Sequence, residues 1–178
     1  MGATVVKTLR ATSLQAATAP RRGATPLPVT RYLLPVTQKA MSITEQEIIK
    51  QRYYDEAMRY IDNAKENLKH AKKDGQYYND QKYVRTACGT AYNGVLIALD
   101  CFLMLKGVKK PTKKERKSVE YYHDSIGKID RKMLNTFNSV YKILHLWGYY
   151  DGIEKVSVVK DGFDEAAKII NKIKPKGE

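Results

Sequence analysis

Hydrophobic residues recur every three or four positions along most of the chain after residue 43, which is the spacing of one face of an α-helix. Thr44 and Glu47 form a capping box at the start of this pattern, because each side chain can satisfy the other's free backbone amide. Lysines crowd the stretch before Gly75, where a helix dipole favours cations. We therefore predict a first helix from Thr44 to Gly75. Its apolar stripe consists of Ala57, Tyr60, Ile61, Ala64, Leu68 and Ala71.

A second stripe runs from about Asp80 to Lys106 and is rich in small residues. Its members are Tyr83, Ala87, Ala91, Val95, Ala98, Leu99, Phe102 and Leu105. Gly89 and Gly94 each lower helix propensity by about 1 kcal/mol relative to alanine, so we attribute them to the close approach of a neighbouring element. The pattern predicts the most buried helix of the fold, ending at Gly107.

Three further helical segments follow Pro111. A second capping box, Thr112–Glu115, opens a helix that breaks near Gly127 and Asp130. The next stripe ends at Gly148, and an irregular stretch with an extended pattern of valines follows over residues 149–160. The last helix is capped by Asp161. The apolar faces of these helices are Val119, Tyr122, Ile126 and Ile129, then Met133, Phe137, Val140, Tyr141, Leu144 and Trp147, and finally Phe163, Ala166, Ile169, Ile170 and Ile173.

Five helical segments with short connections predict an all-α protein, an antiparallel bundle of four to five helices. We assign residues 44–174 to this single domain and residues 175–178 to a short tail. Residues 1–43 differ, since they hold four prolines and six basic residues but no acidic one. They read either as an organellar transit peptide or as upstream sequence before a true start at Met41, which the abrupt change in composition favours. In both cases we expect a disordered segment outside the fold.

The net charge of +13 is concentrated in two places, residues 1–43 and the stretch from Lys106 to Lys117. The second stretch is a candidate site for phosphates, with affinity that falls as salt rises; alternatively it is a solvated loop. It has no interleaved aromatic residue, so binding there would be directed at a nucleic-acid backbone and not at bases. Its basic residues are Lys106, Lys109, Lys110, Lys113, Lys114, Arg116 and Lys117.

The sequence holds no phosphate-binding loop, hydrolase elbow or Cys-x-x-Cys motif, and its three histidines lack metal-binding spacing. We therefore expect no metal and no cofactor. Cys88 and Cys101 lie roughly 20 Å apart on one helix, beyond disulfide reach, which indicates buried thiols in a reducing compartment. The longest apolar run, Val95–Leu105, is interrupted by Asp100 and is too short for a membrane span. These features indicate a cytoplasmic protein with no membrane partner.

Asp100 is an unusual residue in the predicted central helix, because its neighbours are apolar. It shares a face with Asn93 and Thr86 at seven-residue spacing. It either faces solvent or a tyrosine hydroxyl, or it is a buried carboxylate that organises a ligand pocket or a dimer interface. We take Arg85, Tyr92, Asn93 and Asp100 as candidates for such a pocket or interface.

The segment Tyr83–Tyr92, followed by Leu105-Lys106-Gly107, resembles the second long helix of HEPN domains, which is rich in Ala and Tyr and ends in Lys-Gly. The passage Gly75-Gln76-Tyr77 resembles the turn after the first helix of that family. Tyr141 to Asp151 resembles the fourth-helix region, and Phe163 to Ile173 resembles the final helix. The similarity extends over about residues 53–174 and implies a small helical bundle.

Ribonucleases of the HEPN family carry an Arg-x4–6-His motif on a late helix. Here His145 stands where the arginine is expected, and Tyr150 and Asp151 stand where the histidine would follow. The resemblance therefore implies a bacterial branch that lacks the catalytic pair on this helix. Members without the pair are non-catalytic modules, frequently dimeric, that bind a nucleotide or a partner. We expect a homodimer that binds a nucleotide, RNA or a protein partner encoded nearby. The alternative is a divergent ribonuclease or nucleotide-processing enzyme that uses His145, Tyr150 and Asp151.

Overall fold

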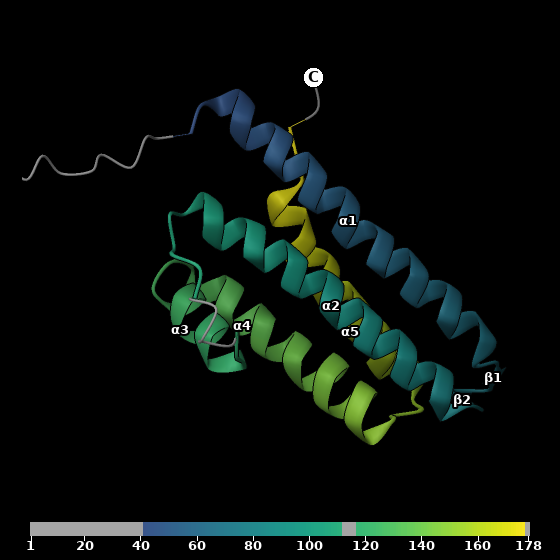
Figure 1. The fold of residues 1–178 in the computed structure, drawn as a ribbon. Helices are drawn as coiled ribbons and strands as arrows, with labels where there is room; N and C mark the ends of the chain where they lie inside the picture. The colour runs from purple at the N-terminus through teal and green to yellow at the C-terminus, as the bar shows by residue number, and fades with distance from the viewer. Residues whose placement is uncertain (1–40, 112–116, 177–178) are drawn as a thin grey trace, which may run out of the picture. The chain divides into compact units, whose positions relative to one another are not determined.

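Six helical elements and one small hairpin make up the part of the chain that the computed structural model describes, residues 41–111 and 117–176, together with a short terminal 3-10 turn (Figure 1). The α-helices are α1 (Ile43–His70), α2 (Gln81–Leu105), α3 (Val119–Gly127), α4 (Arg131–Val140) and α5 (Val156–Ile170). A π-helix, η1 (Tyr141–Asp151), continues α4, and the turn η2 (Asn171–Ile173) follows α5. Strands β1 (Lys73–Asp74) and β2 (Tyr77–Tyr78) pair antiparallel, with Lys73 opposite Tyr78. The all-α prediction is confirmed.

Helix α2 is the central helix, as its small-residue stripe predicts. It lies between α1 and η1, with α5 behind it (Figure 1). Eleven of its 25 residues are buried. At Gly94 a Cβ atom would lie 3.0 Å from the carbonyl oxygen of Ala57 and 3.1 Å from the Cβ of Tyr60. The absence of a side chain therefore lets α1 approach closely, which is the reason expected for the glycines of this helix.

The cap of the first helix lies two residues earlier than predicted, because Ser42 and Glu45 form the capping box and Thr44 does not. Ser42 Oγ accepts the N–H of Glu45 at 3.2 Å, and Glu45 Oε2 accepts the N–H of Ser42 at 2.8 Å. The Ser/Thr-x-x-Glu pattern thus occurs in two overlapping copies, which begin at Ser42 and at Thr44, and the earlier copy caps the helix. The predicted partner Glu47 instead pairs with Lys50 at 2.7 Å and accepts the backbone N–H of Lys176 at 3.0 Å.

The predicted end of the first helix at Gly75 is also wrong. Helix α1 ends at His70, and Lys72 turns the chain with a left-handed backbone (φ 45°). The N–H of Asn79 donates to the carbonyls of Ala71 and Lys72 at 3.1 and 3.3 Å, which holds the chain in the hairpin. Gly75, with φ +57°, lies in the turn between the two strands.

The predictions for residues 148–161 are wrong in two respects. The helix does not end at Gly148, which is buried, because η1 continues to Asp151 and ends at Gly152 with φ +71°. The last helix begins at Val156 and is not capped by Asp161. The valines favour a strand locally, yet Val159 lies on the same buried stripe as the later residues of α5, and packing of that stripe decides the conformation.

Some of the extended character predicted for this stretch is retained just before α5. Lys155 forms an antiparallel bridge with Tyr77, and the N–H of Val156 donates to the carbonyl of Gln76 at 3.0 Å. The hairpin therefore meets the start of α5 through backbone hydrogen bonds. Trp147, predicted in the core stripe, is 36% exposed. The π-helical geometry turns it away from the side chains with which it would align on an α-helix.

The break predicted near Gly127 and Asp130 is confirmed. Helix α3 ends at Gly127, and Asp130 caps α4 by accepting the N–H of Met133 at 2.9 Å. The predicted capping box Thr112–Glu115 lies outside the described residues, and α3 begins at Val119 with Ser118 as its cap. The predictions for residues 1–40 likewise lie outside the described part of the chain.

Both cysteines are buried and free, as expected. Burial raises the pKa of Cys88 to about 12 and that of Cys101 to about 11, so both remain thiols at neutral pH. By length and composition α2 is also long and apolar enough to cross a membrane, although half of its most apolar window is buried inside the bundle. That composition is accounted for by its central position.

Candidate ligand-binding site

Helix η1 is unusual because π-helical geometry persists over 11 residues. Such geometry is rare, and it occurs mostly as single turns, frequently at functional sites. Two glycines allow this helix to lie close to its neighbours. A Cβ atom at Gly148 would lie 2.5 Å from Cys88 Sγ on α2, and one at Gly162 on α5 would lie 2.6 Å from Leu144 Cδ2. The π-helix is therefore packed closely between α2 and α5.

Four tyrosine rings surround the imidazole of His145. Tyr141 and Tyr149 lie four residues before and after it on η1, with ring centroids 5.2 and 5.9 Å from the imidazole and planes inclined by 27° and 13°. Tyr92 on α2 stacks on the imidazole at 4.6 Å. Tyr150 meets it edge-on at 5.1 Å. We call these five residues the His145 cluster.

The His145 cluster is electrically neutral at neutral pH. Burial lowers the pKa of His145, so the imidazole carries no charge there and offers one donor and one acceptor. Burial also raises the pKa of Tyr92, with a smaller effect from Tyr141, so that phenol keeps its proton. The rings therefore present flat, uncharged faces to whatever binds beside them.

A pocket of about 530 Å³ opens beside the cluster, between α2 and η1. Its wall combines aromatic rings with two hydroxyls, one carboxamide and one aliphatic side chain, and none of its lining side chains is a carboxylate, lysine or arginine. The volume lies within the usual range for small-ligand sites. The pocket is lined by Thr86, Gly89, Thr90, Tyr92, Asn93, Leu96, His145 and Tyr149.

Gly89 sets the position of one wall of this pocket. A Cβ atom there would lie 2.9 Å from Cδ2 of Tyr149, closer than real Cβ contacts. The tyrosine ring consequently lies flat against the backbone of α2. Any larger residue at this position would push the ring outward and change the width of the pocket.

The four pocket or interface candidates have different environments. Tyr92 and Asn93 line the pocket, as predicted. Arg85 lies beside it, where its guanidinium donates to the main-chain carbonyls of Tyr149 (3.3 Å), Tyr150 and Asp151 (3.0 Å) at the end of η1. Its hydrogen bonds are thus made to the backbone.

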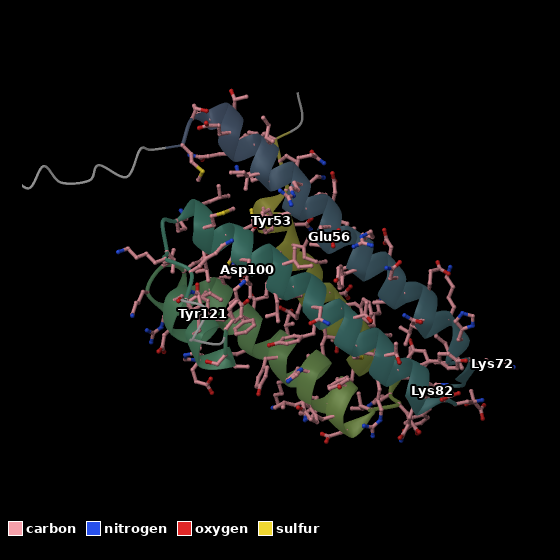
Figure 2. The ribbon with its side chains drawn as sticks, viewed as in Figure 1. Tyr53, Glu56, Lys72, Lys82, Asp100 and Tyr121 are labelled. Atoms are coloured by element: carbon pink, nitrogen blue, oxygen red, sulfur yellow. The ribbon has the colours of Figure 1, made fainter. Side chains whose placement is uncertain are left out.

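Asp100 is not part of the pocket lining, although it follows Leu96 by one turn of α2, and its carboxylate is paired. The hydroxyl of Tyr122 donates to Oδ1 at 2.9 Å, and Lys117 Nζ donates to Oδ2. Figure 2 shows Asp100 in the part of α2 that lies nearer α3, on which Tyr121 is labelled. Lys82, at the start of α2, lies well away from both. Of the two interpretations of Asp100, the contact with a tyrosine hydroxyl is the one observed.

None of the described residues of the basic stretch, Lys106–Pro111 and Lys117, lines the pocket. Lys106 follows Asn93 by thirteen positions along α2, or roughly 20 Å. The ammonium of Lys106 lies 5.8 Å from the ring centroid of Phe102, and Lys117 is paired with Asp100. Lys109 and Lys110 are exposed, whereas Lys113, Lys114 and Arg116 lie outside the described residues. The prediction of phosphate binding there remains untested.

The alternative catalytic residues are only partly brought together. The rings of His145 and Tyr150 are in edge contact, while Asp151 is exposed at the end of η1. Within residues 41–111 and 117–176, no hydrogen bond joins the side chains of these three residues, and no group of three His, Cys, Asp or Glu residues could hold a metal ion.

Tyr141, Tyr149, Gly89 and Thr90 belong to the site but were not predicted from the sequence. The four-residue spacing of Tyr141, His145 and Tyr149 was visible, yet the first of these was assigned to the core stripe. Recognising the cluster would have required knowing that η1 packs against α2. That contact joins residues more than 50 positions apart.

Comparison with known families agrees with this helical architecture. A family model described as a domain of unknown function, DUF5618, matches residues 52–175. The chain belongs to the DUF5618 family. A solved structure described as a protein of unknown function from Dyadobacter fermentans is 40% identical, with a TM-score of 0.61, over 70% of this chain and 95% of the other. A comparison with curated proteins gives no match. The match to the DUF5618 model includes all of α2 and η1, and therefore every residue that lines the pocket.

Proposed function

We propose that this DUF5618 protein is a non-catalytic, HEPN-like binding module whose pocket between α2 and η1 takes a planar ligand, the base of a nucleotide or of RNA. The supporting observation is the neutral His145 cluster beside an open pocket of about 530 Å³. Stacking of a base on an aromatic ring contributes about 1–3 kcal/mol and tolerates different bases. Flat faces with few charges suit such a ligand.

The polar groups of the lining suit the edge of a base. Asn93 is exposed and its carboxamide can both donate and accept a hydrogen bond. The hydroxyls of Thr86 and Thr90 lie on the same side of α2; Thr86 Oγ1 donates to the carbonyl of Lys82 at 2.9 Å and keeps lone pairs free to accept. Donors and acceptors beside a stacking surface are the usual means of base recognition outside a duplex.

The proposal includes a homodimer in the cytoplasm. A protein partner is a further candidate ligand. Two buried free thiols are consistent with a reducing compartment. Residues 141–151, which resemble the late helix of the family, contain no arginine and so no Arg-x4–6-His motif, which supports a non-catalytic role; Arg116 and His123 have this spacing, but earlier in the chain. Four exposed apolar residues within five positions of η1, which are Leu146, Trp147, Tyr149 and Tyr150, offer a surface for a second chain.

Binding to the wild-type protein and to a His145→Ala variant tests the pocket. We expect AMP, UMP or a hexauridylate to bind the wild type, and the affinity to fall about tenfold or more in the variant, since one stacking face is removed. His123→Ala is the matched control, because that histidine is exposed on α3 and lies outside the lining. Equal affinity in the wild type and in His145→Ala would refute the proposal.

The second candidate function is nucleotide or RNA cleavage, and the observation that favours it is the neutral imidazole of His145 in edge contact with the ring of Tyr150. A neutral histidine can act as a general base. The length of the hexauridylate recovered after incubation with the wild type or with His145→Ala, without added metal, distinguishes the two functions. Cleavage by the wild type that is lost in His145→Ala would favour the enzyme, whereas intact RNA favours the binding module.

A further inference from the structure

We infer that Arg85 is the positioning residue of the pocket: its guanidinium ties the end of the π-helix to α2 and thereby holds Tyr149 in place as a wall. The observation is geometric. One side chain donates to three successive main-chain carbonyls, those of Tyr149 (3.3 Å), Tyr150 and Asp151 (3.0 Å). These contacts join positions more than 60 residues apart in the chain.

Carbonyls in the last turn of a helix have no N–H group farther along the helix to bond with. At the end of η1, the carbonyl of Trp147 is satisfied by the backbone N–H groups of Gly152 and Ile153, the latter at 2.9 Å. The carbonyls of Tyr149, Tyr150 and Asp151 accept from Arg85. The guanidinium therefore supplies the donors that the helix lacks, and its charge also faces the negative end of the helix dipole.

Gly152 is adapted to this contact. Its backbone is left-handed (φ +71°), and a Cβ atom there would lie 2.6 Å from Nε of Arg85. A residue with a side chain would thus be strained and would also displace the guanidinium. The turn after η1 and the position of Arg85 depend on each other.

The contact bears on the pocket because of where Arg85 lies on α2. Thr86 is the next residue and Gly89 is one turn later, and both line the pocket. The ring of Tyr149 lies against Gly89, while its carbonyl accepts from Arg85, one turn earlier on the same helix. Tyr149 is 46% exposed, and its ring contacts His145 and Tyr150 on its own helix and α2 at Gly89. The contact with α2 requires that the end of η1 stay against that helix, where Arg85 holds its backbone.

Arg85→Met tests this inference, since methionine keeps much of the apolar length and removes the donors. The chain has a single tryptophan, Trp147, two residues before Tyr149, and its fluorescence reports on the end of η1. We expect acrylamide to quench Trp147 about twofold or more faster than in the wild type, and AMP affinity to fall about tenfold. The measurements compare samples in the same association state.

Lys82→Met is the matched control, because Lys82 is a cation one turn earlier on α2 whose ammonium lies 5.7 Å from the ring centroid of Tyr83. It should match the wild type in both readouts. Arg85→Lys retains the charge but cannot reach three carbonyls at once, and we expect intermediate quenching. If Arg85→Met does not fold, Gly152→Ala perturbs the same contact from the other side and should give the same faster quenching.

Only the AMP-affinity readout of this inference rests on the proposed function, so the outcomes distinguish a failure of one from a failure of the other. If the wild type binds neither AMP nor hexauridylate, the proposed function fails, and the quenching of Trp147 still decides the role of Arg85. The inference is overturned if Arg85→Met, or its substitute Gly152→Ala, shows the wild-type rate of Trp147 quenching and the wild-type affinity for AMP. It is also overturned if Lys82→Met changes these two readouts as much as Arg85→Met does. Faster quenching with unchanged AMP affinity would show that Arg85 orders η1 without positioning the pocket wall, which also overturns it.

Discussion

At the scale of single residues, Asp100 shows how a carboxylate is accommodated on the most apolar helix of the bundle. Its side chain is 21% exposed and has two partners, Lys117 at the end of the basic stretch and the hydroxyl of Tyr122 beyond it. The sequence places Asp100 among apolar neighbours but does not identify these partners, because they lie 17 and 22 positions away. The pairing explains why the charge is tolerated.

Removing the Asp100 carboxylate should leave the Tyr122 hydroxyl buried without its acceptor. We expect Asp100→Ala to lower the free energy of unfolding by about 1–3 kcal/mol, as measured by urea denaturation. Tyr122→Phe removes the hydroxyl itself, so in combination with Asp100→Ala no unpaired donor is left. The double variant should therefore lose less free energy of unfolding than the sum of the two single losses. Strict additivity of the two substitutions would contradict the pairing.

Candidate site residues differ in how far the sequence identifies them. Tyr92 and Asn93 are predicted as pocket or interface residues, and His145 is predicted only through the resemblance to HEPN domains; all three line the pocket. Tyr149 was assigned to an irregular stretch, since nothing near it in the chain indicates that a π-helix continues past Gly148. Arg85 was recognised, but its three carbonyl partners follow only from the packing of η1 on α2.

At the scale of elements, helix boundaries with a side-chain cap were the most predictable. Asp80 begins α2 by accepting the N–H of Lys82 at 2.9 Å, and Asp130 begins α4 by accepting the N–H of Met133 at 2.9 Å. Such caps join residues two or three positions apart, so a local pattern suffices to find them. The Thr44 prediction failed because two overlapping patterns competed for the same helix start.

The cap of α4 makes a prediction about pH. The pKa of Asp130 lies below its ordinary value, mainly because the carboxylate accepts the N–H of Met133, with Lys172 also contributing. A lowered folded-state pKa means that the stabilisation is present above pH about 4 and is lost as pH falls through the folded-state value. We expect Asp130→Ala to cost about 0.5–2 kcal/mol at pH 7.

That difference between Asp130→Ala and the wild type should shrink as the pH is lowered below about 4. Thermal denaturation at a series of pH values measures it. Asp130→Asn is the control, since its carboxamide oxygen can still cap the helix but does not titrate, so its stability relative to Asp130→Ala should not depend on pH. A constant difference between Asp130→Ala and the wild type over this range would exclude the carboxylate as the cap.

Helix η1 and the start of α5 show which elements local sequence does not determine. The valines before α5 favour a strand by intrinsic preference, but Val159, Ala166, Ile169 and Ile170 share a buried stripe that only a helix can form. The π-helix depends on Gly148 and Gly162, whose missing side chains let three helices meet. Both features are consequences of contacts between distant segments.

At the scale of the whole molecule, the exposed apolar residues of η1 bear on association. Leu146, Trp147, Tyr149 and Tyr150 are between 36% and 59% exposed and lie within five positions. Exposed apolar side chains grouped in this way are usual where another chain binds. The homodimer that we propose would cover this surface while leaving α1 free.

Sedimentation velocity tests the homodimer. We expect the wild type to sediment as a dimer and Leu146→Glu to sediment as a monomer, because a carboxylate buried in the interface would lack a partner. Ile48→Glu is the matched control, since Ile48 is a 65% exposed apolar residue on α1 and should not affect association. A monomeric wild type would contradict the proposal of a dimer, and the binding experiments on the pocket would still stand.

The sequence alone determined the all-α class, the central small-residue helix and the boundaries at Asp80, Gly107 and Asp130, because periodicity and capping act between residues a few positions apart. The tertiary structure decided the π-helix, the hairpin, the partners of Asp100 and the pocket around His145. Each of these depends on contacts between segments far apart in the chain, where the close approach of two backbones at Gly89 or Gly148 determines which side chains meet.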